Sequence, residues 1–196
     1  MPKLIKLWWF PACLAALSAV LQFTGQRDLW QFDRAAIDGG AWWLLFTGNL
    51  VHLNTGHLAL NLLGLSVIVL LVWHHLRTPQ WLACFAISAA AVGVGLYLRD
   101  PELSYYVGLS GVLHGLLLAG IIIDVAKDPR GGWILLAAIV AKLGWEQWHG
   151  AVPGSEWAAG GTVVVNSHLY GAVAGAVVGV VILAWRTLGG SSRGRA

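Results

Sequence analysis

The stretch Gly108-Leu109-Ser110-Gly111 stands where a polar segment, Arg99 to Tyr106, gives way to an apolar run, Val112 to Ile123. This change predicts that Ser110 lies at the N-terminal end of a membrane helix. Unpaired backbone N–H groups and the positive end of the helix dipole favour a developing negative charge there. The flanking glycines allow a sharp turn and the close approach of another helix. The stretch therefore suits a nucleophilic serine.

Apolar runs of membrane-spanning length fill nearly the whole chain of 196 residues. A spanning helix needs about 20 apolar residues, and 58% hydrophobic against 11% charged residues excludes an ordinary soluble domain. We expect helices over approximately Leu7–Phe23, Leu50–Trp73, Trp81–Leu98, Ser110–Val125, Trp133–Trp148 and Thr162–Trp185. The predicted fold is an all-α membrane protein, a single six-transmembrane-helix domain over residues 1–188 with a disordered polar tail over residues 189–196.

Basic residues predict the orientation of this bundle. Most of them fall on the side of the two termini: Lys3, Lys6, Arg77, Lys127, Arg130, Arg186, Arg193 and Arg195. The other side has Arg27, Arg34 and Arg99. Both termini should be cytoplasmic, because cytoplasmic loops carry the excess of Lys and Arg. The net charge of +3 is small and scattered, so we expect the lipid bilayer, and no nucleic acid, as the partner of this surface.

Polar residues of three predicted helices should meet at one depth. The helices that start near residues 50, 110 and 162 all run from outside to inside. His57 and Asn61 share a face at spacing i+4, and His168 lies about 9 Å below its helix start at 1.5 Å per residue. Such residues inside a membrane indicate function, because leaving them unpaired in lipid is costly.

Glycines predict how two of these helices pack. Gly171, Gly175 and Gly179 recur at spacing four below His168, and Gly111 and Gly115 follow Ser110. Strips of small residues let helices approach closely. If the two strips meet, His168 lies beside Ser110.

This arrangement predicts a serine nucleophile with an imidazole base. Ser110 needs a group that takes its proton, and His168 is the expected partner. We see no carboxylate on the same helix as His168 or near Ser110, so a dyad is expected rather than a triad. Tyr170, or a stacking or backbone contact, would hold the ring. His57, Asn61 and the N–H of Ser110 are suitable oxyanion donors, each worth about 3 kcal/mol.

Each of these residues also has a structural explanation. Small residues and serines line helix contacts in many membrane proteins, and a single histidine in a membrane helix often pairs with a backbone carbonyl. Lys142 could snorkel to the interface, or it could form a structural ion pair with Glu146 at spacing i+4. His52 and His57 are spaced poorly for a shared metal site. We expect no metal and no cofactor.

Three separated segments resemble the signature segments of rhomboid intramembrane serine proteases. They are His52-Leu53-Asn54-Thr55-Gly56-His57-Leu58-Ala59-Leu60-Asn61, Gly108-Leu109-Ser110-Gly111, and Ser167-His168-Leu169-Tyr170-Gly171 with Gly175. Ser167 stands where that family usually has alanine. The resemblance implies Ser110 as nucleophile, His168 as base, and His57 and Asn61 in the oxyanion hole.

Further segments are similar to the rhombosortase subfamily. They are Phe32-Asp33-Arg34-Ala35-Ala36-Ile37, Trp42-Trp43, Thr47-Gly48-Asn49-Leu50-Val51-His52, Gly108 to Gly115, and Lys142-Leu143-Gly144-Trp145-Glu146-Gln147. This resemblance implies a protease of the bacterial inner membrane with its active site toward the periplasm. Its substrates would be single-span membrane proteins with a C-terminal GlyGly-CTERM signal, which combines a Gly-Gly segment, one transmembrane helix and a basic tail. The alternative is an inactive rhomboid-like protein that binds transmembrane clients.

Overall fold

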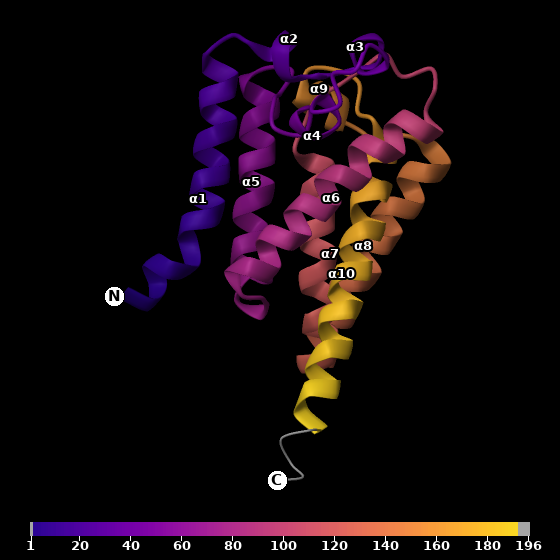
Figure 1. Cartoon of the computed structure of the whole chain (residues 1–196). Coiled ribbons are helices and arrows are strands. Elements are labelled where there is room, and N and C mark those ends of the chain that lie inside the picture. Colours follow the sequence, from indigo (N-terminus) through magenta and orange to yellow (C-terminus); the bar gives the residue numbers. More distant parts are fainter. Residues whose placement is uncertain (1, 192–196) are drawn as a thin grey trace.

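Long helices packed side by side form the body of the molecule (Figure 1). The computed structural model describes the backbone of residues 2–191 and the side chains of residues 8–188. The long helices are α1 (Pro2–Phe23), α5 (Thr55–Leu71), α6 (Thr78–Arg99), α7 (Ser110–Lys127), α8 (Pro129–His149) and α10 (Val165–Ser191). Each apolar run predicted above corresponds to one of them.

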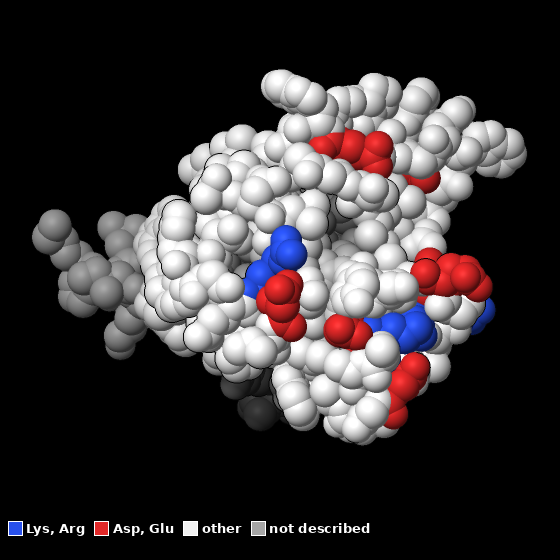
Figure 2. All heavy atoms as spheres, turned by 90° about the horizontal axis from the view of Figure 1, so that it is seen from above, with Lys and Arg blue, Asp and Glu red and all other residues white. Residues whose placement is uncertain are grey.

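Short elements cover one end of this bundle (Figure 1). They are α2 (Arg27–Trp30), α3 (Arg34–Asp38), α4 (Leu44–Thr47) and α9 (Ser155–Ala159). Seen from that end, most of the charged side chains on the surface are acidic (Figure 2). The 3-10 turn η1 (Trp73–His75) joins α5 to α6 at the opposite end.

We call the short elements at this end of the bundle, residues 27–47 and 155–159 with the strands below, the cap. The all-α prediction needs one correction, because two short strands pair within the cap. Strand β1 (Phe32–Asp33) is antiparallel to β2 (Tyr105–Tyr106). Arg34 follows β1, and its guanidinium donates hydrogen bonds to backbone carbonyls at the C-terminal end of α6 and just beyond it: those of Leu96, Tyr97, Asp100 and Leu103. The last carbonyls of a helix have no partner within the helix. Arg34 therefore fastens the cap to the bundle.

Three helices are long and apolar enough to cross a membrane: Thr78–Arg99, Ser110–Lys127 and Val165–Leu188. The apolar stretches Trp8–Phe23 and Thr55–Leu71 are shorter. Helix α8 carries Lys142 and Glu146 and is not among the candidate spans found in the described part of the chain. The number of six spans and the cytoplasmic termini stay predictions.

Helix α7 is the central element, with neighbours in α5, α6, α8 and α10. Its contact with α10 is made through backbone atoms. A Cβ added to Gly171 would lie 1.9 Å from the carbonyl oxygen of Gly111, and one added to Gly175 would lie 1.9 Å from that of Gly115. No side chain fits in that space. The predicted contact between the two glycine strips is confirmed.

Helix starts differ from the prediction where a cap sets them. The side chain of Asn54 accepts a hydrogen bond from the N–H of His57 (2.9 Å), so α5 begins at Thr55 rather than Leu50. His57 consequently lies in the first turn of α5, and not seven residues below the predicted start at Leu50. At the C-terminus, the backbone of 189–191 continues α10, in place of the predicted disorder. The rest of the predicted tail, 192–196, lies outside the described residues.

A second polar contact lies at the end of the bundle that carries η1. Nε2 of His75 is 2.8 Å from Oδ1 of Asp124, which is ion-pair distance. The guanidinium of Arg186 donates a hydrogen bond to the carbonyl oxygen of His75 (3.0 Å). The ring of Trp73, just before these residues, stacks on Trp81 with centroids 4.4 Å apart. We refer to His75 and Asp124 as the η1-end pair.

Candidate active site

Ser110 and His168 meet at the first turns of two helices. Ser110 is the first residue of α7, and His168 is the fourth residue of α10. Oγ of Ser110 lies 2.9 Å from Nε2 of His168, a hydrogen-bond distance. His168 is only 5% exposed. The backbone contact at Gly111 and Gly171, directly below, holds the two helices at the separation that this hydrogen bond requires.

His57 and Asn61 lie on α5 and face the same cavity as Ser110 and His168. Nδ1 of His57 accepts a hydrogen bond from the N–H of Leu53 (3.4 Å), which leaves the proton of a neutral ring on Nε2. The amide of Asn61 donates to the carbonyl oxygen of His57 (3.0 Å) and has a second N–H. Both side chains therefore have a donor available.

Gly108 lets the His57 ring lie close to the backbone that precedes Ser110. Its φ is +130°, a value that favours glycine, and a Cβ there would lie 2.8 Å from Cε1 of His57. The amide of Gly108 donates to the carbonyl oxygen of Gly48 (3.1 Å), and its carbonyl accepts from the hydroxyl of Tyr106 (2.7 Å). The turn before Ser110 is thus fixed on both sides.

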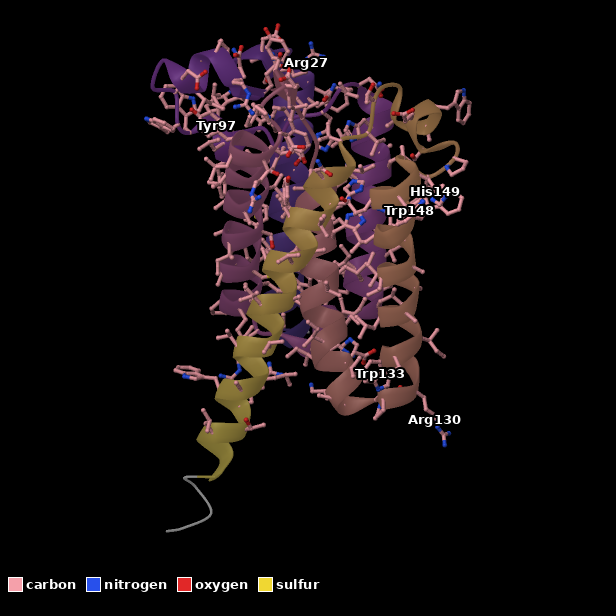
Figure 3. The ribbon with its side chains drawn as sticks, turned by 90° about the vertical axis from the view of Figure 1, so that its right-hand side faces the viewer. Arg27, Tyr97, Arg130, Trp133, Trp148 and His149 are labelled. Carbon is pink, nitrogen blue, oxygen red and sulfur yellow. The ribbon has the colours of Figure 1, made fainter. Side chains whose placement is uncertain are left out.

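The cavity has a volume of about 470 Å³ and lies between α5 and α8, with α7 behind it. Leu60, Leu63 and Val67 of α5 line it and are themselves partly exposed on the bundle surface. Helix α8 runs from Arg130 and Trp133 at one end to Trp148 and His149 near the capped end (Figure 3). The cavity is therefore apolar toward the lipid side and polar where the four predicted site residues gather.

Residues 39–185 match the family model described as Rhomboid domain. The chain belongs to the rhomboid family. It is similar to the protein named "Putative rhomboid protease YdcA" of Bacillus subtilis (strain 168), with 30% identity over 108 residues, which make up 55% of this chain and 52% of that protein. The chain thus spans about half the length of this relative. Membership of the family, together with the apolar helices, makes it a multi-pass membrane protein.

A carboxylate contacts the imidazole of this rhomboid, contrary to the sequence expectation. Glu146 of α8 is 2% exposed, and its two carboxylate oxygens lie 2.9 and 3.0 Å from Nδ1 of His168. The expectation considered only the helices of Ser110 and His168, whereas the carboxylate comes from a third helix. The predicted ion pair of Lys142 with Glu146 is confirmed, with Nζ and Oε2 2.7 Å apart.

Tyr170 does not hold the His168 ring of this rhomboid. Its hydroxyl donates to a carboxylate oxygen of Asp100 (2.8 Å), away from the cavity. Instead the ring of His114 stacks on His168, with centroids 4.2 Å apart and planes inclined by 18°. The stacking alternative of the sequence analysis is therefore the one found, with His114 as the partner.

Sequence reasoning missed His114, Lys142 and Glu146 as neighbours of the site. The available signals were spacing and polarity. His114 is four residues after Ser110 and so lies on the same face of α7. Lys142 and Glu146 are an i, i+4 pair that follows the apolar run 133–141 of α8, and charges inside a membrane helix usually face the interior of a bundle.

Ligand atoms of His114, Glu146 and His168 lie within 4.8 Å of one another, an arrangement that could hold a metal ion. The ammonium of Lys142 already lies among them, with Nζ 2.6 Å from Nε2 of His114 and 3.1 Å from Nδ1 of His168. A metal ion bound to these three residues would have to displace that ammonium.

His52 lies beside the site in the loop before α5, completely buried. Its ring meets the ring of His57 edge to face, with centroids 5.2 Å apart. Burial, reinforced by the neighbouring His57, lowers the pKa of His52 to about 3. His52 is therefore neutral at physiological pH and supports the His57 ring as an uncharged residue.

Proposed function

We propose that this rhomboid-family chain is an intramembrane serine endopeptidase with Ser110 as nucleophile and His168 as general base. The observation that carries the proposal is the 2.9 Å contact between Oγ of Ser110 and Nε2 of His168 at the wall of the cavity. A serine hydroxyl becomes an effective nucleophile when a base within hydrogen-bond reach accepts its proton. Polar residues at such a depth in a membrane are costly to bury, and they usually mark a functional site.

The reaction follows from these two groups. Oγ of Ser110 bonds to the scissile carbonyl carbon while its proton passes to Nε2 of His168. The tetrahedral intermediate collapses as His168 returns the proton to the leaving amine, and an acyl-enzyme remains. A water molecule then gives its proton to His168 and attacks the ester, which frees the acid and restores Ser110.

His57 and Asn61 are the proposed oxyanion donors, together with the N–H of Ser110. The oxyanion gains most from donors that are already oriented before the reaction. The Nε2–H of His57 and the second amide N–H of Asn61 meet this requirement, since their other polar atoms are engaged with Leu53 and the α5 backbone.

The proposed substrates are single-span membrane proteins that reach Ser110 between α5 and α8. The apolar lining on α5 suits a transmembrane segment, and the polar floor suits an unwound one. A Gly-Gly segment at the top of such a helix unwinds readily, which fits C-terminal GlyGly-CTERM signals. With this substrate class we also propose that the protein lies in a bacterial inner membrane and that Ser110 and His168 are on its periplasmic side.

The nucleophile is tested with a fluorophosphonate probe on the purified protein. Wild type should be labelled, Ser110→Ala should lose the label, and His168→Ala should be labelled much more slowly. Ser66→Ala is the matched control, because the Ser66 hydroxyl is bonded to the α5 backbone on the exposed side of the helix. Labelling that persists in Ser110→Ala would contradict the proposal.

The substrate class is tested separately by co-expression of a single-span protein with a Gly-Gly segment and a basic tail. We expect cleavage by wild type, none by Ser110→Ala, and weaker cleavage when the two glycines are replaced by valine. Cleavage that ignores this replacement would argue against the substrate class alone. A client that copurifies uncut with a protein that the probe does not label would support the client-binding alternative.

A further inference from the structure

Five side chains and one backbone carbonyl form a closed chain of contacts that starts and ends on Ser110. Its hydroxyl contacts His168 (2.9 Å), His168 contacts Glu146 (2.9 Å), and Glu146 contacts Lys142 (2.7 Å). Lys142 contacts Nε2 of His114 (2.6 Å), and Nδ1 of His114 lies 2.7 Å from the carbonyl oxygen of Ser110. We call these residues the Ser110 ring.

Donor and acceptor rules fix the direction of the contacts at His114. A carbonyl oxygen only accepts, so Nδ1 of His114 carries a proton and donates it to the Ser110 carbonyl. Nε2 of the neutral ring is then an acceptor, and the Lys142 ammonium donates to it. The same ammonium donates to Oε2 of Glu146. Lys142 is thereby held at two points at distances of 2.6 and 2.7 Å.

The same rules leave two possibilities at His168. If Nδ1 carries the proton, it donates to Glu146, and Nε2 is free to accept the Ser110 proton. If Nδ1 is bare, it accepts from Lys142 at 3.1 Å, and Nε2 carries a proton and fails as a base. The first possibility uses the two shorter contacts to Glu146. It also gives every residue of the Ser110 ring a hydrogen-bond partner.

We propose that Glu146 is a positioning residue that sets the tautomer and orientation of His168, and that Lys142, anchored through His114 to the Ser110 carbonyl, holds Glu146 in place. This inference rests on the proposed function. When Ser110 gives its proton to His168, the new imidazolium faces the Glu146 carboxylate, and the Nδ1 proton stays on His168. Lys142 balances the charge of Glu146 in the resting state, so no net charge is buried.

Burial makes these contacts effective, although Glu146 also borders the cavity. Glu146 and His168 are 2% and 5% exposed, and hydrogen bonds are electrostatically stronger in such surroundings than in water. His168 lies between Glu146 and Ser110, so a change at Glu146 should act on the chemical step and leave substrate binding nearly unchanged.

The test compares Glu146→Gln, Glu146→Asp and the exposed neighbour control Gln147→Glu in turnover of a single-span substrate by the full-length protein in vesicles. We expect kcat to fall roughly 10²- to 10⁴-fold in Glu146→Gln with KM within about twofold. Glu146→Asp should recover at least tenfold of that loss, because it restores a carboxylate. Wild-type kcat in Glu146→Gln would overturn the proposal.

A spectroscopic measurement guards against a loss that comes only from misfolding. The ¹⁵N spectrum of histidine-labelled protein, assigned by omission of one histidine at a time, should show the Nδ1–H tautomer of His168 in wild type. Glu146→Gln with Lys142→Met, which removes both buried charges, should lose the preference for that tautomer while keeping the folded spectrum of the remaining histidines. An Nε2–H tautomer in wild type, or a preference unchanged in the double variant, would refute the proposal.

The two levels of proposal fail differently. Turnover that survives in Ser110→Ala would refute the proposed protease itself. Turnover lost in Ser110→Ala but unaffected in Glu146→Gln would leave the protease intact and refute only the role of the Ser110 ring.

Discussion

Two histidines of this molecule lie against a carboxylate, at opposite ends of the bundle. Nδ1 of His168 is 2.9 Å from Glu146, and Nε2 of His75 is 2.8 Å from Asp124. Both pairs are largely buried, and both border a cavity, of about 470 Å³ at His168 and about 570 Å³ at His75. By these measures the two ends are alike.

They differ in what lies on the other side of the ring. The second nitrogen of His168 meets the Ser110 hydroxyl. Among the described residues that line the cavity at His75 there is no Ser, Thr or Cys, and its charged residues are Arg77, Lys127 and Arg186. A histidine–carboxylate contact can therefore be buried beside a cavity without a serine at the other ring nitrogen. In the proposed reaction, the Ser110 hydroxyl at Nε2 is what gives the His168 contact a catalytic role.

The largest contrast should be in turnover. Ser110→Ala or His168→Ala should lower the rate by at least about 10⁴-fold, since each group acts on the reacting atoms. His75→Ala should leave the rate within about threefold when the protein is folded. Initial rates on a single-span substrate in vesicles measure both. A comparable loss in all three variants, with intact folding, would abolish the distinction between the two ends.

Removal of the negative charge sharpens the contrast between the carboxylates. Glu146→Gln should lower kcat roughly 10²- to 10⁴-fold, whereas Asp124→Asn should change the rate little and lower the free energy of unfolding by about 1 to 3 kcal/mol. Denaturant titration in detergent, read beside the rates, checks this. A rate loss in Asp124→Asn equal to that in Glu146→Gln would mean that the η1-end pair also serves the reaction.

Alanine at the α7–α10 contact should act more strongly near Ser110 than near Asp124. A Cβ at Gly171 meets the Gly111 carbonyl oxygen at 1.9 Å, while one at Gly179 meets that of Ala119 at 3.0 Å. Overpacking costs about 1 to 3 kcal/mol, so Gly171→Ala should destabilise the fold and slow turnover, and Gly179→Ala should do less of both. Gly144→Ala, which meets open space on α8, is the control. Equal effects at Gly171 and Gly179 would contradict the packing argument.

The smallest effect should be a pH dependence of stability from His52. Its pKa in the folded protein is about 3, below the ordinary value of about 6.5, so the unfolded chain binds the proton first. The contribution of His52 to stability is complete above about pH 6.5 and is lost as the pH falls toward 3. Between pH 7 and pH 5 this amounts to about 2 kcal/mol.

His75 provides the comparison for this titration. Burial also lowers its pKa, with its neighbour His74 as the next cause, but the Asp124 contact acts in the opposite direction. Replacing His52 with leucine should therefore flatten the unfolding free energy between pH 7 and pH 5 more than replacing His75 does. Unfolding curves at matched ionic strength measure it, and a flatter profile for the His75 variant would reverse the assignment.

Much of the architecture could be predicted from the sequence, because apolar runs and glycine spacing are local signals. The six long helices and the contact of the strips at Gly111 and Gly171 followed from them. The cap was not predicted in detail, since its two-residue strands and the Arg34 contacts join segments far apart in the chain. Helix starts moved where a side chain such as Asn54 caps them.

At the site, the sequence predicted the contact between residues near the starts of two helices that were expected to run in the same direction. Ser110 and His168 were paired by depth and by the glycine strips. Glu146 was missed because its partner depends on how α8 is rotated about its own axis, and the weak periodicity of α8 does not show this. Tyr170 was offered as a support for His168, but the side chain turns to Asp100 because the neighbouring glycine of α6, Gly95, leaves room for its ring.

The backbone contact between α7 and α10 divides the molecule into a stiff half and a deformable half. Backbone carbonyl oxygens of α7 occupy the space that side chains of α10 would otherwise fill. We therefore expect that α7 and α10 can hardly slide along each other or rotate about their axes. Any widening that admits a client helix must then come from α5 or α8, whose facing sides share few direct contacts. We expect slow hydrogen exchange along α7 and α10 and faster exchange in the last turns of α8, near His149. This pattern would show that Ser110 and His168 stay fixed while the opening between α5 and α8 changes width.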